Sequence, residues 1–176
     1  PSLKLCISTA EVLTEENIKI IQSAFGVPIV NEYGTSESGV VSFGNSNKMI
    51  ISNQSLNVEV IKSKNLFGDE NAGKIVITDY FNEAMPFVRY DLGDIVSLDN
   101  TNVSNKKTYY INKIFGREND MVLLENGKKL PGFSIIKPID YHISENPADY
   151  KNQLREFVLI QNDINEFRLN LDINRD

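Results

Sequence analysis

A short polar run over residues 31–39 holds most of the side chains in this chain that could bind a nucleotide. Its sequence, Asn-Glu-Tyr-Gly-Thr-Ser-Glu-Ser-Gly, combines an aromatic ring, a turn glycine, hydroxyl groups and carboxylates. Tyr33 could stack on a base, Ser36 could donate a hydrogen bond to a phosphate oxygen, and Glu37 is a suitable ligand for Mg²⁺. Polar runs of this kind are also common in plain turns, so the local pattern leaves both interpretations open.

Two segments further along the chain place charged residues beside glycine. Residues 89–94 read Arg-Tyr-Asp-Leu-Gly-Asp, and the Asp94 carboxylate could accept hydrogen bonds from both hydroxyls of a ribose. The alternative is a turn braced by a salt bridge from Arg89. Residues 116–120 read Gly-Arg-Glu-Asn-Asp, where the Arg117 guanidinium could bind a phosphate or ribose oxygen. Glycine with mixed charges is equally typical of an exposed linker.

The elements that position the first run follow from the hydrophobic pattern. Residues 3–7 are mostly apolar, which predicts a buried strand with Cys6 as a small core residue. Thr14 followed by two acids predicts the start of a helix, and Gly26 predicts its end. Residues 27–30 predict a second strand. The polar run therefore follows the carboxyl end of a strand, where open α/β sheets bind their ligands.

After residue 39 the pattern changes to short strand-like segments separated by Gly, Asn and Asp, which predicts a small antiparallel sheet or barrel. The segments are residues 40–43, 49–52, 56–61, 74–78, 94–98 and 108–114. An Asn-Gly turn at residues 126–127 predicts a hairpin. Pro138 argues against one uninterrupted helix over residues 133–143. Residues 157–160 and 167–173 predict two further strands.

Composition excludes several classes of function. The chain has 176 residues and a net charge of −6, with 41% hydrophobic and 24% charged residues. Without a basic cluster or a long apolar run, nucleic acid and membrane are poor partners. One cysteine, Cys6, fits a reducing cytoplasm. One histidine, His142, leaves little for a metal cluster or a Ser-His triad. The start at Pro1 without Met suggests a piece of a longer protein.

The order of the three polar segments carries a resemblance to a known family. Tyr-Gly-x-Ser-Glu at residues 33–37, Arg-Tyr-x-x-Gly-Asp at 89–94 and Gly-Arg-x-x-Asp at 116–120 resemble the adenylate-forming superfamily of acyl-CoA synthetases. Within it, the chain is most similar to phenylacetate-CoA ligases and related enzymes of capsular polysaccharide biosynthesis. The segments that favour this branch are residues 82–86, 119–120, 123–128, 131–132 and 157–161.

The resemblance implies a C-terminal fragment of an α+β enzyme. Residues 1–115 would be the C-terminal part of a large adenylation domain, with an α/β edge over 1–39 and a small distorted antiparallel β-barrel over 40–115. Residues 116–176 would begin a small α+β domain. The implied reaction joins a carboxylic acid to ATP with Mg²⁺, giving an acyl-adenylate, and passes the acyl group to a thiol such as coenzyme A.

The resemblance also implies roles for single residues. The nucleotide-binding positions are Ala10, Glu11, Tyr33, Gly34, Thr35, Ser36, Asp94 and Arg117. Tyr33 would stack on adenine, Gly34 would permit a tight loop, and Asp94 would hold the ribose hydroxyls. Ser36, Glu37 and Arg117 would be the catalytic residues, with Glu37 as the ligand of Mg²⁺.

Three departures from the family pattern bear on these implications. The phosphate loop rich in Ser, Thr and Gly has no match in the chain, nor has the late catalytic lysine, and Asn119 stands where the family has a hinge aspartate. We therefore expect the chain to be inactive alone. The alternatives are a non-catalytic member that binds nucleotide or acyl ligand, or transfer of the acyl group to an amine or a sugar. The identity of the acid and the oligomeric state are not encoded in any recognisable pattern.

Overall fold

The computed structural model describes residues 2–45, 47–62, 66–103, 106–145 and 154–173, and the chain forms two compact units, Pro1–Glu118 and Asn119–Asp176. We call these unit 1 and unit 2. The division falls inside a short 3-10 helix, η2 (Glu118–Asp120). The assignment of the two units to a large and a small enzyme domain stays a prediction.

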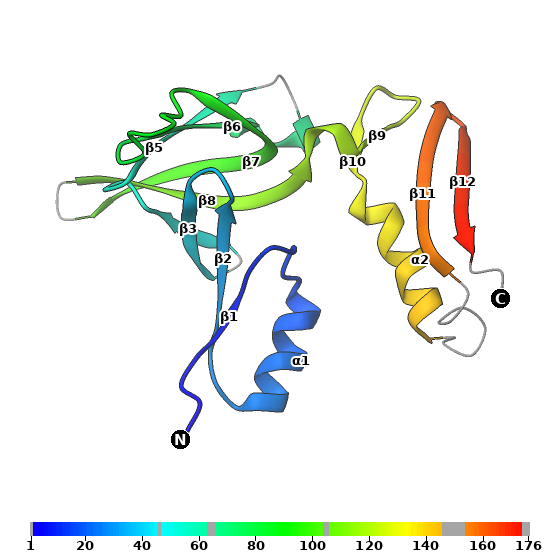
Figure 1. Ribbon diagram of the computed structural model, residues 1–176, viewed down its shortest axis with the longest axis horizontal. Coiled ribbons are helices and arrows are strands. Elements are labelled where there is room, and N and C mark those ends of the chain that lie inside the picture. Colours follow the sequence, from blue (N-terminus) through cyan, green and yellow to red (C-terminus); the bar gives the residue numbers. More distant parts are fainter. Residues whose placement is uncertain (1, 46, 63–65, 104–105, 146–153, 174–176) are drawn as a thin grey trace. The chain divides into compact units, whose positions relative to one another are not determined.

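Unit 1 is built on one mixed eight-stranded sheet in its described residues (Figure 1). The strands are β1 (Cys6–Ser8), β2 (Ile29–Thr35), β3 (Gly39–Asn45), β4 (Lys48–Ile51), β5 (Leu56–Lys62), β6 (Ala72–Asp79), β7 (Tyr90–Val103) and β8 (Lys106–Arg117). Their order across the sheet is β1-β2-β3-β4-β8-β7-β6-β5. Only β1 and β2 are parallel, and every other neighbouring pair is antiparallel.

The sheet curls so that strands distant in its order face each other. A side-chain hydrogen bond joins β2 to β7, although three strands separate them in the sheet. The inner face holds the core of the unit, because apolar side chains of the antiparallel strands alternate inward. The buried core residues are Val41, Met49, Ile51, Leu56, Ile75, Ile77, Leu92, Val96 and Ile111. The predicted edge and barrel are thus one continuous sheet rather than two separate pieces.

The predicted strand-helix-strand start is confirmed, with one error in burial. Helix α1 (Glu15–Phe25) begins after Thr14, whose hydroxyl accepts a hydrogen bond from the Asn17 backbone, and ends at Gly26 in the left-handed conformation (φ 65°). Strand β1 was expected to be buried over residues 3–7. It covers only three residues, and Ile7 is 61% exposed. The reason is its position at the edge of the sheet, where only β2 pairs with it.

Among its described residues, unit 2 contains two hairpins and a helix. Strands β9 (Met121–Leu123) and β10 (Lys129–Pro131) form the predicted Asn-Gly hairpin, with Gly127 at a φ of 73°. Strands β11 (Leu154–Asp163) and β12 (Glu166–Ile173) form the second hairpin. The Gln161 side chain links the two, since its amide oxygen accepts from the Leu123 N–H (2.9 Å) and its NH₂ donates to the Leu123 carbonyl (2.7 Å).

The prediction against an uninterrupted helix was wrong. Helix α2 runs from Phe133 to Glu145 with Pro138 inside it. Proline removes one backbone donor from a helix interior and is usually costly there. The pattern of Ile135, Ile136 and Ile139, which are all half-buried, favours a helix strongly enough to retain it. No helix in the described part of the chain is long and apolar enough to cross a membrane.

Candidate functional site

Tyr33 and Asp94 meet across the curled sheet of unit 1. Tyr33 lies on β2, next to a register shift at Gly34, and its ring packs against the core. Its hydroxyl donates a hydrogen bond to Asp94 Oδ2 over 2.6 Å. Burial, and then the contact with the Asp94 carboxylate, raise the pKa of the Tyr33 phenol above its ordinary value. The phenol is therefore protonated at neutral pH and acts as a fixed donor to Asp94.

Arg117 completes this cluster from the last position of β8. It lies opposite Asp94 in the register of β7 and β8. Its Nη1 atom is 3.6 Å from Asp94 Oδ1 and donates to the Leu92 carbonyl over 2.6 Å. The Asp94 side chain is only 14% exposed, whereas that of Arg117 is 62% exposed. One end of the guanidinium is thus anchored while the rest of its fork can reach an anion.

The tip of the β2–β3 hairpin carries Ser36 and Glu37. Ser36 is exposed, and Glu37 is half-buried. The Tyr90 hydroxyl, from the first residue of β7, donates to Glu37 Oε1 over 3.3 Å. The Thr35 hydroxyl accepts from the Ser38 backbone (3.2 Å) and contacts the Ser38 hydroxyl (3.0 Å), which fixes the turn. The hairpin therefore presents one hydroxyl and one oriented carboxylate on the same turn.

The Tyr-Gly-x-Ser-Glu motif at residues 33–37 was predicted to lie in a loop, and the structure places most of it in a strand. Tyr33, Gly34 and Thr35 belong to β2, and only residues 36–38 form the loop. Gly34 was expected to permit a tight loop through its backbone freedom. Its φ is not positive. Glycine is favoured there because a Cβ would lie 3.0 Å from the Gly39 carbonyl oxygen across the hairpin, closer than a Cβ usually packs. The positive φ of the turn is at Gly39, at 65°.

Ala10 and Glu11 form a bend after β1, and in the described residues the Glu11 side chain makes no hydrogen bond or ion pair to the cluster. Ala10 has a φ of 74°, a left-handed conformation that destabilises a non-glycine residue by about 1–2 kcal/mol. The structure therefore brings together Tyr33, Asp94 and Arg117 directly, but not these two positions.

Glu37 is the candidate metal ligand, and it stands alone. Among the described residues there is no group of three or more His, Cys, Asp or Glu side chains that could hold a metal ion. This donor set does not suit a metal held by protein alone. It suits Mg²⁺ that binds one carboxylate and takes its other oxygens from water and substrate phosphates.

Sequence reasoning missed two members of the cluster. The Tyr90 hydroxyl holds Glu37, and the Leu92 carbonyl holds Arg117. Tyr90 stands inside the Arg-Tyr-x-x-Gly-Asp motif, so its position was visible, but only the curl of the sheet shows which group it contacts. Arg89 was the plain alternative in that segment, and it does brace the turn, through Glu59 at 3.2 Å.

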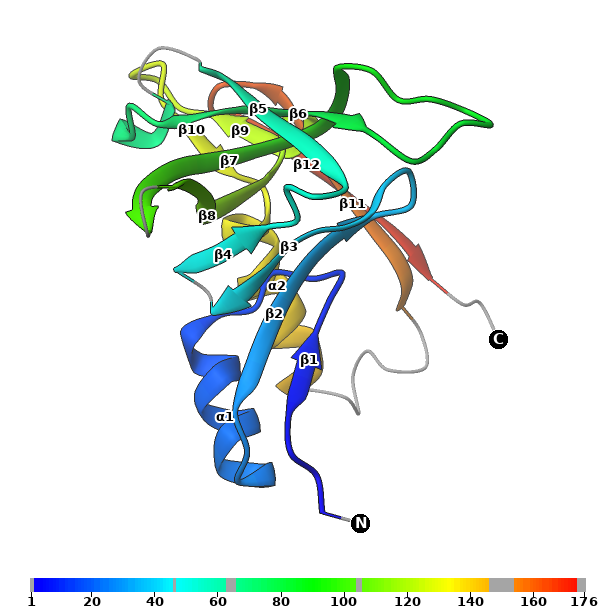
Figure 2. The same ribbon diagram turned by 90° about the vertical axis from the view of Figure 1, so that its left-hand side faces the viewer.

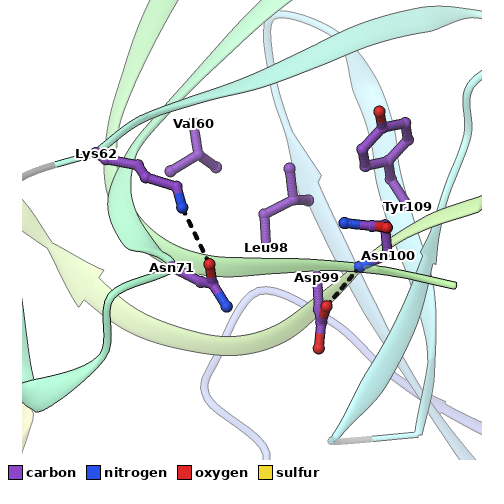
Figure 3. Close-up of a pocket in the computed structure, with 7 residues that line it drawn as sticks. All are labelled: Val60, Lys62, Asn71, Leu98, Asp99, Asn100 and Tyr109. Atoms are coloured by element: carbon purple, nitrogen blue, oxygen red, sulfur yellow. Dashed lines mark hydrogen bonds between the residues drawn. The ribbon is translucent and has the colours of Figure 1, made fainter.

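An open cavity of about 180 Å³ lies at the other end of the β7–β8 pair (Figure 3). Its lining residues are Val60, Lys62, Asn71, Leu98, Asp99, Asn100 and Tyr109. Lys62 donates to the Asn71 amide oxygen over 3.0 Å, and Asp99 accepts from the Asn100 backbone over 2.7 Å. None of the residues predicted to bind nucleotide lines this cavity.

Comparison with known proteins gives one curated relative. The chain is 29% identical to Protein CapK of Staphylococcus aureus over 169 residues. The match covers 95% of this chain and 35% of the relative, so the chain spans about a third of the length of that protein. No family model matches the chain.

Solved structures with the same fold are adenylate-forming enzymes. 2-Hydroxyisobutyryl-CoA ligase, in the postadenylation state with 2-HIB-AMP, matches 98% of this chain and 37% of its own length, at 17% identity and a TM-score of 0.61. Anthranilate CoA ligase AuaEII, in complex with anthranoyl-AMP, matches 90% of this chain and 31% of its own, at 16% identity and a TM-score of 0.56. The adenylation domain of a carboxylate reductase from Mycobacterium chelonae matches 96% of this chain and 26% of its own length, at 14% identity and a TM-score of 0.57. The chain is thus similar in sequence to part of Protein CapK, and it shares the fold of part of these adenylate-forming enzymes.

Proposed function

We propose that the chain is part of an ATP-dependent ligase that activates a carboxylic acid as an acyl-adenylate and transfers the acyl group to a thiol such as coenzyme A. The observation that carries the proposal is the meeting of Tyr33, Asp94 and Arg117 in one cluster. These residues come from three motifs far apart in the sequence. Their order resembles the superfamily, and their contacts put them on one face of the sheet.

The nucleoside would bind at Tyr33 and Asp94. A carboxylate has about four acceptor positions, and the Tyr33 hydroxyl and Arg117 occupy only part of them. The remaining positions can accept both hydroxyls of a ribose. The face of the Tyr33 ring supplies a flat surface for the base, and the hydrogen bond from its hydroxyl to Asp94 fixes the plane of the ring.

The phosphates would bind toward the hairpin tip and the free end of Arg117. The reacting carboxylate and the α-phosphate are both anionic, so the site must offset their repulsion and the charge on the departing pyrophosphate. Arg117 offers N–H donors beside a half-buried carboxylate, and Ser36 offers an exposed hydroxyl. Glu37 would hold Mg²⁺, which supplies positive charge to the phosphate oxygens when it is bound.

No general base is required of this chain, since the attacking group is already a carboxylate. The contacts of Tyr33, Asp94 and Arg117 bear on the nucleotide, and the choice of acyl acceptor rests on the solved structures of similar fold. The solved structure of 2-hydroxyisobutyryl-CoA ligase contains 2-HIB-AMP and coenzyme A, and that of AuaEII contains anthranoyl-AMP. These ligands support an acyl-adenylate for this chain, with a thiol as the acceptor to be tested first.

The test uses the longer protein that we expect to contain this chain. Pyrophosphate exchange into ATP is measured with a panel of aromatic and short aliphatic acids in the presence of Mg²⁺. We expect exchange with at least one acid, and loss of it in Asp94→Ala. Asp99→Ala, at the other end of β7, is the matched control and should retain exchange. An intact protein that shows no exchange with any acid would refute the proposal.

The chain alone provides a second measurement. Because it covers 35% of its relative, we expect weak ATP binding at best, with no submicromolar affinity by calorimetry. Where binding is measurable, Glu37→Gln should weaken its dependence on Mg²⁺ more than Ser38→Ala does. Ser38 is a matched control because its hydroxyl and backbone contact Thr35 within the same turn.

A further inference from the structure

Tyr90 joins two parts of unit 1 that are far apart in the sequence. It is the first residue of β7, and its hydroxyl donates a hydrogen bond over 3.3 Å to Glu37 Oε1, which lies 53 residues earlier at the tip of the β2–β3 hairpin. In the described part of the chain, no hydrogen bond or ion pair reaches the other carboxylate oxygen, Oε2. Tyr90 thus fixes one oxygen of Glu37 and leaves the second available.

The backbone just before Tyr90 is held in an unusual conformation. Arg89 has a φ of 49°, in the left-handed region that residues with a Cβ rarely adopt. Its N–H donates to the Thr78 hydroxyl over 3.0 Å, and its Nε atom donates to Glu59 Oε2 over 3.2 Å. Such conformations persist where surrounding contacts fix them, and they are frequent near functional sites. The bend at Arg89 sets the direction in which β7 starts, and therefore the place from which the Tyr90 side chain reaches the hairpin.

The ring of Tyr90 is also supported from one side. The Phe87 ring lies 4.8 Å from it between centroids, with the two planes tilted by 57°, an arrangement that aromatic pairs favour. The Phe87 carbonyl accepts from the Asp79 N–H over 2.9 Å, which ties this neighbour to the end of β6. Tyr90 itself is paired with Ile77 in the register of β6 and β7. The ring and the backbone of Tyr90 are therefore both fixed by the fold of unit 1.

A hydrogen bond to one oxygen of a carboxylate affects how that carboxylate binds a metal ion. In nucleotide sites, Mg²⁺ is held by one or two carboxylates and takes its other ligands from water and phosphates. Carboxylates that bind a metal are usually hydrogen-bonded themselves, and loss of that outer partner typically weakens metal binding by about 10- to 100-fold. The Tyr90 hydroxyl stands in this outer position toward Glu37, the candidate metal ligand.

We propose that Tyr90 is a positioning residue for Glu37. Tyr90 holds the carboxylate through Oε1, so that Glu37 presents Oε2 to the Mg²⁺ of a bound nucleotide. The proposal rests on the proposed function in one respect, the role of Glu37 as the ligand of Mg²⁺. It assigns a task to a residue that the motif resemblance leaves without one.

Binding of ATP to the longer protein, measured by calorimetry over a range of Mg²⁺ concentrations, tests the proposal. In Tyr90→Phe, the Mg²⁺ concentration that gives half of the maximal effect on ATP affinity should rise about tenfold or more. The affinity for ATP without Mg²⁺ should stay unchanged, because Tyr90 acts through the metal ligand. Tyr80→Phe is the matched control. Tyr80 directly follows β6 and is 57% exposed, and its variant should leave both quantities unchanged.

A double-mutant cycle on the chain alone tests the contact without a metal ion. Tyr90→Phe should lower the folding equilibrium constant, obtained from urea unfolding, by about two- to fivefold, the size expected for one partly exposed hydrogen bond. In a Glu37→Ala background the same change should have little effect, because the acceptor is already gone.

The outcomes separate this proposal from the ligase function. An effect of Tyr90→Phe that is the same in both backgrounds would overturn the proposal. So would an unchanged Mg²⁺ dependence in Tyr90→Phe, an equal shift in Tyr80→Phe, or an ATP affinity of the wild-type protein that does not depend on Mg²⁺. Absence of pyrophosphate exchange with every acid, together with a Mg²⁺ dependence that Tyr90→Phe weakens, would refute the ligase function and support the role of Tyr90.

Discussion

The two ends of β7 place a carboxylate in very different surroundings. Asp94, near the start of the strand, accepts a hydrogen bond from the half-buried Tyr33 phenol and faces a guanidinium. Asp99, five residues further and roughly 16 Å along the strand, accepts from the Asn112 amide at 3.3 Å and from the Asn100 backbone. The first end gathers ionisable groups from three strands, β2, β7 and β8, of the curled sheet that Figure 2 shows from the side. The second is bound by neutral donors.

A cavity and a cluster of interacting ionisable side chains therefore lie at different places along β7. The 180 Å³ cavity lies at the Asp99 end, lined by groups whose partners are mostly amides and backbone. The Asp94 end has the groups of the proposed nucleotide site, namely a fixed ring, an acceptor and a partly exposed cation. If charged, fixed side chains mark the important end, changes at Asp94 should have larger effects than changes at Asp99.

The largest expected effect is on stability after removal of each carboxylate. Asp94→Ala leaves the half-buried Tyr33 hydroxyl without its acceptor and removes the ion-pair partner of Arg117, and should lower the free energy of unfolding by about 2–3 kcal/mol. Asp99→Ala should lower it by about 1 kcal/mol or less, because its partners are neutral donors and the Asn100 backbone among them is open to water. Urea unfolding at pH 7 measures both. Equal losses would show that the two ends do not differ.

The next effect concerns the phenol alone. Tyr33→Phe keeps the ring in the core and removes only the donor to Asp94, and should cost about 1.5 kcal/mol, as expected for a hydrogen bond to a charged acceptor. Tyr110→Phe is the matched control. Its ring lies under the Lys48 ammonium at 4.8 Å, a contact that phenylalanine retains, so the loss should stay within about 0.5 kcal/mol. A loss in Tyr110→Phe as large as in Tyr33→Phe would contradict this distinction.

The same phenol predicts a dependence on alkaline pH. Its pKa is raised in the folded chain, so above the unfolded value of about 10 the unfolded state releases a proton that the folded state retains. The free energy of unfolding should then fall with pH, by about 1 kcal/mol between pH 10 and pH 11 from this group alone. Tyr33→Phe should lack that part of the decline. Parallel urea titrations of the two proteins from pH 9 to pH 11 give the comparison, and parallel declines would refute it.

Strand positions were largely predictable because their signals are local. The alternating apolar residues of β3 to β6 and the Asn-Gly turn at Gly127 mark strands and a hairpin directly. The exposure of β1 was not predictable, because it depends on which strand has only one neighbour. Pro138 misled the prediction for α2, since tertiary packing outweighed a local preference.

The candidate site was predictable in its residues and not in its connections. The motif order selected Tyr33, Asp94 and Arg117, yet nothing in the spacing shows that a phenol on β2 bonds to a carboxylate 61 residues later. That contact requires the curl of the whole sheet. The role of Gly34 was likewise misjudged, because a close approach across a hairpin leaves no mark in the sequence other than the glycine itself.

The smallest expected effect tests whether backbone strain is gathered at the same end of the sheet as the Tyr33 cluster. Ala10 follows the carboxyl end of β1, which runs parallel to β2, and its φ of 74° disfavours any residue with a Cβ. Ala10→Gly should raise the free energy of unfolding by about 0.5 kcal/mol, because relief of that strain slightly exceeds the added freedom of the unfolded chain. Ala24→Gly, in the last turn of α1, makes the same chemical change at a helical position and should lower it by about 0.5–1 kcal/mol. Thermal and urea unfolding of both variants give the two signs. If Ala10→Gly also destabilises the chain, the left-handed bend at Ala10 is not strained. The end of the sheet that holds the Tyr33 cluster would then be distinguished by its side-chain contacts alone.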